Sequence, residues 1–167
     1  PTGTATSGAI NPRLIVPFVN SVRNVFSTMV KVPTEIDRPI VKTATNASYD
    51  VSSIIGFSGD VVGSVVVSFQ LEAAKKLVAA FAQMEFDVES PDFADALGEL
   101  ANMIAGSAKK DLGCKASIST PSVIVGSGHH IARLSDVPTL IVPCRTPVGD
   151  FAVEISIKQV VRQAAAA

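Results

Sequence analysis

Two strand-like runs around a short turn place the strongest constraint on the fold of this chain. Residues 49–57 and 61–69 are rich in Val, Ile, Ser and Phe, and Ser58-Gly59-Asp60 separates them. Such runs on either side of a Gly-containing turn are typical of a β-hairpin, in which the two strands pair antiparallel. The sequence therefore predicts an antiparallel sheet that includes residues 49–69.

Helices and further strands surround this hairpin. Asn11-Pro12 is a helix start, because Asn can cap and Pro suits the first turn, and apolar residues then follow a helical period to about Val32. Pro17 is expected to kink or delay this helix. Two more helices are predicted over residues 71–83 and 91–112, and strands over residues 36–44, 115–125, 129–134, 138–145 and 150–158.

The predicted fold class is α+β: an antiparallel β-sheet packed with about three α-helices, in the order α-βββ-α-α-βββ(β). Pro39 marks residues 36–44 as an edge strand. No nucleotide-binding fingerprint and no βαβ alternation is present. The length of 167 residues suits one domain, which we expect over residues 11–158, with a flexible tail over residues 1–10 and another over residues 159–167.

Composition excludes several classes of function. Hydrophobic residues make up 47% and charged residues 17% of the chain, which indicates a packed protein. The net charge is −1, no basic block occurs and aromatics are 5%, so nucleic acid is not an expected partner. Apolar runs stay well short of the roughly 20 residues that span a membrane, and no export signal is visible, so we expect a cytoplasmic protein without membrane contact.

The predicted helix over residues 91–112 has two distinct faces. Glu99 and Asn102 are three positions apart, so their side chains lie together on its solvent face, with Asp95 one turn earlier. Gly98 and Gly106 are expected on the same face, although an exposed Gly inside a helix costs about 1 kcal/mol relative to Ala. Two such glycines favour a surface that a partner protein approaches closely. A merely solvated polar face is the alternative that periodicity leaves open. The core face carries Phe93, Leu97, Leu100, Ala101, Ile104, Ala105, Ala108 and Leu112.

The same helix carries a family resemblance. The run from Asp95 to Gly106, DALGELANMIAG, resembles the D/S-x₃-E-x₂-N signature of the CheC/CheX chemotaxis phosphatases, and Pro121 resembles a later proline of that family. The opening INPRLIVPFVNSVRNVFSTMV and the hairpin SIIGFSGDVVGSVVVSF are also similar to CheX-like sequences. The resemblance covers about residues 10–158, and the chain is identified as a CheX-like member of this family.

The resemblance implies a phosphatase that dephosphorylates the phospho-aspartate of a CheY-like response regulator. It implies that Asn102 orients the attacking water and that Glu99 pairs with a cationic side chain of the regulator. Asp95, Gly98 and Gly106 would contact the partner. The chain would bind no cofactor or metal, and the Mg²⁺ ion would belong to the regulator. The first helix has Asn20-Ser-Val-Arg23 in place of E-x-x-N, which implies a single site, and CheX-like relatives imply a homodimer formed through the sheet.

Other readings of the sequence are weaker. The main alternative is a non-catalytic module, either a receiver-binding adaptor or a flagellar-switch-like protein. His129 and His130 are adjacent, so on a strand they would point to opposite faces and not share a metal. With Ser127 and Ser135 they form no recognisable nucleophile arrangement. Lys109 and Lys110 suit the negative C-terminal end of the helix dipole. Cys114 and Cys144 lack the spacing of a CxxC motif or a zinc site, so we expect them to be ordinary buried residues. The sequence does not identify the regulator or its pathway.

Overall fold

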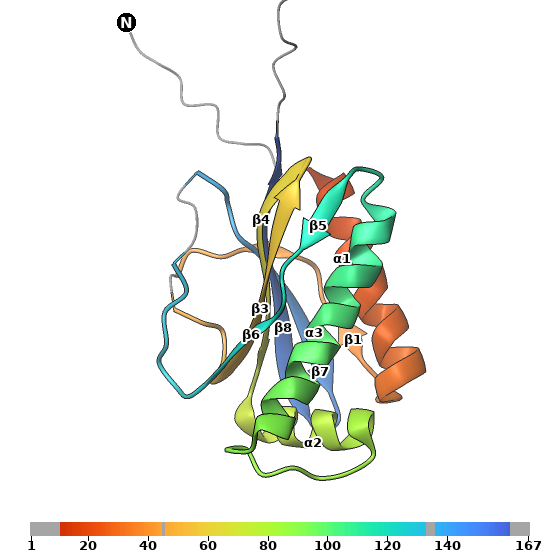
Figure 1. The fold of residues 1–167 in the computed structure, drawn as a ribbon, viewed down its shortest axis with the longest axis vertical. Coiled ribbons are helices and arrows are strands. Elements are labelled where there is room, and N and C mark those ends of the chain that lie inside the picture. The colour runs from red at the N-terminus through yellow and green to blue at the C-terminus, as the bar shows by residue number, and fades with distance from the viewer. Residues whose placement is uncertain (1–10, 45, 133–135, 161–167) are drawn as a thin grey trace, which may run out of the picture.

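The computed structural model of this chain describes residues 11–44, 46–132 and 136–160. The predicted N-terminal tail, residues 161–167 of the predicted C-terminal tail, and Ser135 lie outside the described residues. Within the described residues, three α-helices and one antiparallel sheet form the fold (Figure 1), so the predicted α+β class is confirmed.

The predicted hairpin forms two inner strands of the sheet. Strands β3 (Val51–Gly59) and β4 (Val61–Phe69) pair antiparallel from Val51–Phe69 to Phe57–Gly63. Gly63 has φ of +135°, and a Cβ there would lie 2.0 Å from the Ser156 carbonyl oxygen of the neighbouring strand. The position therefore requires glycine, which explains the second glycine of the run Gly59-Asp-Val-Val-Gly63 in this hairpin.

The other strands extend the sheet on both sides of the hairpin. In the described part of the chain the sheet has eight strands in the order β1-β7-β8-β4-β3-β5, with β2 also paired to β7 and β6 to β3. Their bounds are β1 (Glu35–Ile36), β2 (Ile40–Val41), β5 (Ala116–Ile118), β6 (Ser122–Val125), β7 (Leu140–Thr146) and β8 (Gly149–Gln159).

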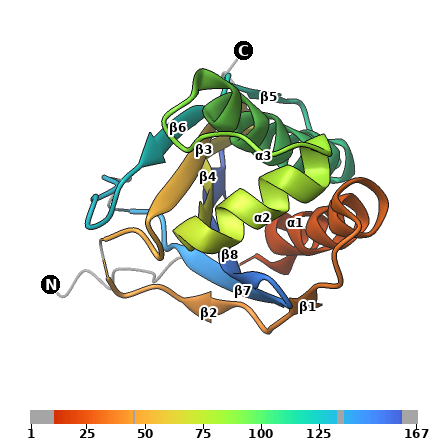
Figure 2. The same ribbon diagram turned by 90° about the horizontal axis from the view of Figure 1, so that it is seen from below.

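The helices cover one face of this sheet, as Figure 2 shows from below. They are α1 (Pro12–Val25), which continues into the π-helical turn η1 (Phe26–Val30), α2 (Leu71–Ala82) and α3 (Pro91–Asp111). Asn11 caps α1 by accepting a hydrogen bond from the Arg13 amide at 3.0 Å, as its sequence position predicts. The helix begins at Pro12, so the expectation that Pro17 delays it is wrong.

The core lies between the helices and the sheet. Phe26 of η1 stacks on Phe151 of β8 with ring centroids 4.5 Å apart, and Phe69 of β4 stacks on the same ring at 5.6 Å. All three rings are at most 1% exposed. Their burial removes a large apolar area from water and ties the helical layer to the two central strands.

Irregular segments cover the opposite face of the sheet. Glu154 of β8 is fully buried there and accepts hydrogen bonds from Lys42 Nζ at 2.7 Å and from the Ser48 amide and hydroxyl. The His129 ring lies 2.8 Å from the Ser52 hydroxyl and 2.7 Å from the Gly126 carbonyl oxygen. These contacts satisfy polar groups that would otherwise be buried without partners.

Three predicted strands differ from the structure. Residues 36–44 form two short strands, β1 and β2, rather than one. Of the strand predicted over residues 129–134, residues 133–134 lie outside the described residues. Residues 129–132 form only an isolated bridge between His130 and Asn46, because the His129 ring and backbone hold this segment over the sheet face. Residues 115–125 divide into β5 and β6, which pair with different ends of β3.

Candidate functional site on helix α3

The cap and the core contacts of α3 fix the candidate site on a rigid element. The Ser90 hydroxyl accepts a hydrogen bond from the Phe93 amide at 3.3 Å, and Pro91 occupies the first turn. Seven of the eight predicted core-face residues are buried, namely Phe93, Leu97, Leu100, Ala101, Ile104, Ala105 and Ala108. Packing therefore determines which way the other face of the helix points.

The five predicted site residues differ in exposure. Asp95 and Glu99 are exposed, and Asn102 and Gly106 are partly buried. Glu99 and Asn102 lie one turn apart on the outer side of α3, as their spacing predicts. The helix therefore presents one carboxylate and one carboxamide on a convex, accessible surface.

Gly98 corrects one expectation of the sequence analysis. It is buried, not exposed, because it packs against the segment that joins β5 to β6. A Cβ at this position would lie 3.0 Å from Pro121 Cγ and 3.8 Å from Val123 Cγ2. The glycine therefore lets this segment approach α3, and it leaves no open backbone for a partner. Gly106 has more room, because a Cβ there would meet only Ile118 Cδ1, at 4.0 Å.

Helix α1 supports α3 from the other side. The two helices lie side by side and run in opposite directions in Figure 1, and the buried Ser21 hydroxyl donates to the Ile104 carbonyl oxygen at 2.7 Å. On the exposed face of α1, Arg23 Nη1 lies 3.4 Å from Asn20 Oδ1. Helix α1 thus carries an amide and a guanidinium on its exposed face.

The described residues offer little chemistry elsewhere. They contain no cluster of three His, Cys, Asp or Glu side chains suited to a metal ion. Burial raises the pKa of the Cys144 thiol to about 12, so this group is a poor nucleophile at neutral pH. None of the described helices is long and apolar enough to cross a membrane.

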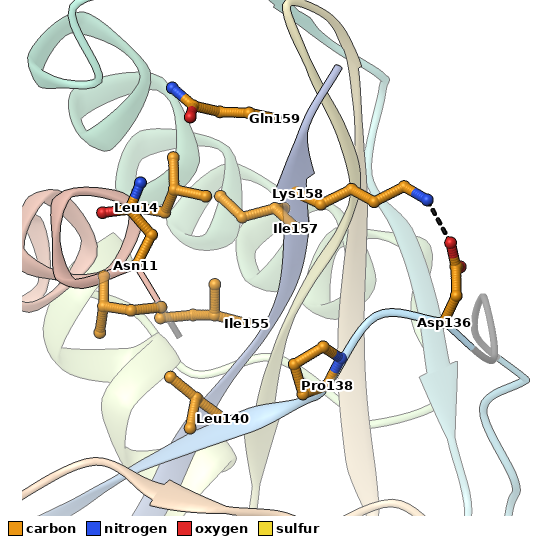
Figure 3. A pocket seen from close by; sticks show the side chains of 10 residues that line it. Asn11, Leu14, Asp136, Pro138, Leu140, Ile155, Ile157, Lys158 and Gln159 are labelled. Carbon is orange, nitrogen blue, oxygen red and sulfur yellow. Dashed lines mark hydrogen bonds and ion pairs between the residues drawn. The ribbon is translucent and has the colours of Figure 1, made fainter. Parts of the chain in front are cut away.

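A separate pocket lies beside the start of α1 (Figure 3). Its volume is about 300 Å³, and none of its lining residues belongs to α3. Lys158 points away from Asn11 and Leu14 and forms an ion pair with Asp136. The hydrogen bond from Lys158 lowers the pKa of the Asp136 carboxyl. The pocket is lined toward α1 by the apolar Leu14, Leu140 and Ile155 and by the polar Asn11.

One feature of the site was missed by the sequence analysis. Residues 115–125 were expected to form one strand, whereas the chain leaves the sheet at residues 119–121, beside α3. Pro121 was the available signal, because proline interrupts a strand ladder. The sequence could not show that this interruption faces Gly98.

Comparison with known proteins agrees with this architecture. A family model described as chemotaxis phosphatase CheX matches residues 51–145. The CheY-P phosphatase CheX of Thermotoga maritima is 25% identical over 153 residues, covering 89% of this chain and 98% of the relative.

Solved structures give the same result. The chemotaxis protein CheX from Desulfovibrio desulfuricans is 34% identical, with a TM-score of 0.77, 88% of this chain covered and 99% of that chain. CheX in the CheX-CheY-BeF₃-Mg²⁺ complex from Borrelia burgdorferi is 28% identical, with a TM-score of 0.75, covering 87% and 98%. The family match and the full-length similarity lead to one conclusion: this chain belongs to the CheX family of chemotaxis phosphatases.

Proposed function

We propose that this chain is a phosphatase that hydrolyses the phospho-aspartate of a CheY-like response regulator, with Asn102 and Glu99 as its catalytic residues. The main observation behind this proposal is that Glu99 and Asn102 lie on the same outer side of α3, whose other side is packed into the core. The Thermotoga relative is a CheY-P phosphatase, and the Borrelia relative has been crystallised with CheY, which supports the same substrate here.

The reaction needs a water molecule held in line with a breaking bond. The water oxygen attacks phosphorus, the bond between phosphorus and the aspartate oxygen breaks, and the products are inorganic phosphate and a free carboxylate. Such transition states are loose, so catalysis depends mainly on positioning and on charge stabilisation. The Asn102 carboxamide can accept a hydrogen bond from the water and orient it without acting as a base.

Glu99 has a different task. Its side chain is exposed, so it can stay solvated in the free protein and form an ion pair when a partner docks. We assign it an ion pair with a cationic side chain of the regulator. Asp95, one turn earlier and also exposed, would lie at the edge of this contact, and the partly buried Gly106 would lie at the other end. Gly98 is buried within the chain, so we no longer assign it to the partner surface.

We assign the Mg²⁺ ion to the regulator, and the presence of Mg²⁺ in the Borrelia complex supports a role for the ion when the two proteins are bound. When bound there, the ion would neutralise charge on the phosphoryl oxygens. The residues of this chain would then only dock, place the water and stabilise the docked state. The proposal also places the protein in the cytoplasm, together with its regulator.

We further propose that the protein is a homodimer. Strands β1 and β2 pair with β7 on one side only, so their outer edge is open in the chain described. Val16, Ile40 and Val41 are each more than half exposed beside this edge. An open edge next to exposed apolar side chains is commonly covered by another chain.

The function is tested by Asn102→Ala. A phosphorylated receiver domain is mixed with each variant, and phosphate release is followed over time. We expect the wild-type chain to accelerate release and Asn102→Ala to be about 100-fold slower, the scale on which a lost positioning group acts. The position is not in the core, so the free energy of unfolding should change by only about 0.5 kcal/mol.

Asn24→Ala is the matched control, because it makes the same change at an exposed position of the neighbouring helix. It should release phosphate at the wild-type rate. Near-normal release by Asn102→Ala would contradict the catalytic assignment. Binding of the phosphorylated receiver without accelerated release by the wild-type chain would favour the receiver-binding adaptor instead.

A further inference from the structure

The interruption between β5 and β6 is a bulge in the edge of the sheet. Phe57 of β3 pairs with Ile118, and Ile54 pairs with Ser122. Between these pairs, the three residues 119–121 oppose the two residues Ile55 and Gly56. One extra residue on one strand defines a bulge, a feature that often redirects side chains near functional sites. We call residues 119–121 the bulge segment.

Ser119 holds the bulge segment in place. Its hydroxyl oxygen accepts a hydrogen bond from the Gly56 amide at 2.9 Å, and its hydroxyl donates to the Thr120 carbonyl oxygen at 2.9 Å. Its own amide donates to the Gly56 carbonyl oxygen at 2.9 Å. Ser119 is itself exposed, so these bonds do not serve the core. They fix the direction in which the chain leaves β5 and reaches Pro121.

The bulge segment lies along the stripe of α3 that contains Asn102. Gly106, one turn after Asn102, faces Ile118, the residue before the bulge segment. Gly98, one turn before Asn102, faces Pro121, the last residue of the bulge segment. Asn102 lies between these two glycines on the helix, so its spacing directs it toward the middle of the bulge segment, Ser119 and Thr120.

We propose that Ser119 is a positioning residue for Asn102. By holding the bulge segment beside α3, it provides a wall that limits the orientations of the Asn102 carboxamide. Asn102 is partly buried and Glu99 is exposed, which agrees with a wall beside Asn102 and not beside Glu99. The catalytic consequence rests on the function proposed above for the α3 site.

Restriction of this side chain has a direct effect on rate. The terminal torsion of Asn is broad, so an unrestrained carboxamide samples many orientations. A water molecule held by such a group is in line for only part of the time. Misplacement of a reacting group by about 1 Å can reduce a rate about 100-fold. Loss of the wall should therefore lower kcat more than it changes KM.

The test compares Ser119→Val with Ser119→Thr. The two replacements have nearly the same shape, but only Thr keeps the hydroxyl that bonds to Gly56 and Thr120. Both are favourable in strands, so both variants should fold, which circular dichroism checks. Ser117→Ala is the control, because Ser117 lies in β5 two residues before Ser119, is exposed and makes no side-chain hydrogen bond to the residues described.

Two readouts are taken from each variant. The first is the kcat and KM for dephosphorylation of a phosphorylated receiver domain. The second is the NMR order of the Asn102 side-chain amide in the free protein, whose signal is assigned by its loss in Asn102→Ala. For Ser119→Val we expect kcat to fall about tenfold or more with KM within about twofold, and the Asn102 signal to become more mobile. Ser119→Thr and Ser117→Ala should match the wild type.

The outcomes separate this inference from the proposed function. An unchanged Asn102 signal in Ser119→Val overturns the positioning role, whatever the rate. If the Asn102 signal becomes more mobile in Ser119→Val but kcat is unchanged, the positioning of Asn102 by Ser119 does not contribute to turnover. If the wild-type chain releases no phosphate, the proposed function fails, and the NMR comparison alone decides whether Ser119 positions Asn102.

Discussion

Glu99 and Asn102 differ in their surroundings although they lie only one helical turn apart on α3. Asn102 is partly buried and lies between Gly98 and Gly106, which face Pro121 and Ile118, whereas Glu99 is exposed. A covered group keeps a defined orientation, which suits the placement of a water molecule. An exposed carboxylate is solvated until a partner reaches it, which suits an ion pair made on docking.

This difference predicts the behaviour of Glu99→Ala. The change should raise KM about tenfold and also lower kcat, because it removes a contact that holds the regulator against α3. It should also make KM less sensitive to salt, since screening acts on the ion pair that has been lost. Steady-state kinetics at two NaCl concentrations measure both effects.

Asp95→Ala is the comparison for Glu99→Ala. It removes the same charge one turn away, at an exposed position on the same helix. A contact at the rim of an interface contributes little, so the increase in KM should be smaller. If Glu99→Ala leaves KM and its salt dependence unchanged, Glu99 makes no ion pair with the regulator.

At the level of single residues, the sequence of α3 predicts the exposed face of the helix but not which segment lies next to that face. The period of apolar residues fixed the sides of Glu99 and Asn102 correctly, because burial of one face orients the whole helix. Gly98 was misplaced because it lies at the border of that face. Whether a border position is open depends on the neighbouring segment, and here Pro121 covers it.

Among the elements, α3 and the β3–β4 hairpin were the most predictable. Each carries its own local signals: Ser90-Pro91 starts α3, and Gly59 and Gly63 take positive φ angles in the hairpin. The short edge strands were less predictable, because their pairing is decided by partners far away in sequence. Residues 129–132 include the buried Ile131, and this composition predicts a strand. The segment instead covers the sheet face and forms only an isolated bridge.

The two glycines of α3 give a prediction about this element. Gly106→Ala should stabilise the protein by about 0.5–1 kcal/mol, because Ala favours the helix and its Cβ has room. Gly98→Ala brings the same gain in helix propensity but places a Cβ 3.0 Å from Pro121 Cγ, so it should be less stable than Gly106→Ala.

Chemical denaturation of both variants measures this difference, with the wild type as reference. A displaced Pro121 would also disturb the bulge segment, so Gly98→Ala should lower phosphatase activity more than Gly106→Ala does. Equal gains in stability from the two changes would mean that the bulge segment yields freely and does not form a firm wall beside α3.

The whole molecule has two different sides. Helices cover one face of the sheet and place the α3 site there, and irregular segments cover the other (Figure 2). A groove of about 440 Å³ lies between α1 and the β2 edge, and its lining is apolar. Its members are Pro12, Ile15, Val16, Val19, Pro39, Val41 and Leu140. None of them belongs to α3, so the groove and the candidate site are separate surfaces.

The proposed dimer gives a prediction at this scale. The chain has a mass of 17.3 kDa, and light scattering at micromolar concentration should give about twice that value for the wild type. Val41→Asp should shift the mass toward the monomer, because Val41 is 54% exposed at the open edge and a charge there opposes burial in an interface. Met84→Asp is the matched control, since Met84 is 57% exposed but lies after α2, outside the groove. The Met84→Asp variant should remain dimeric.

Because α3 contributes nothing to the groove, monomeric Val41→Asp should still release phosphate at a rate near that of the wild type. A wild-type mass near 17.3 kDa would contradict the dimer, and loss of activity in a folded Val41→Asp monomer would contradict the independence of the two surfaces.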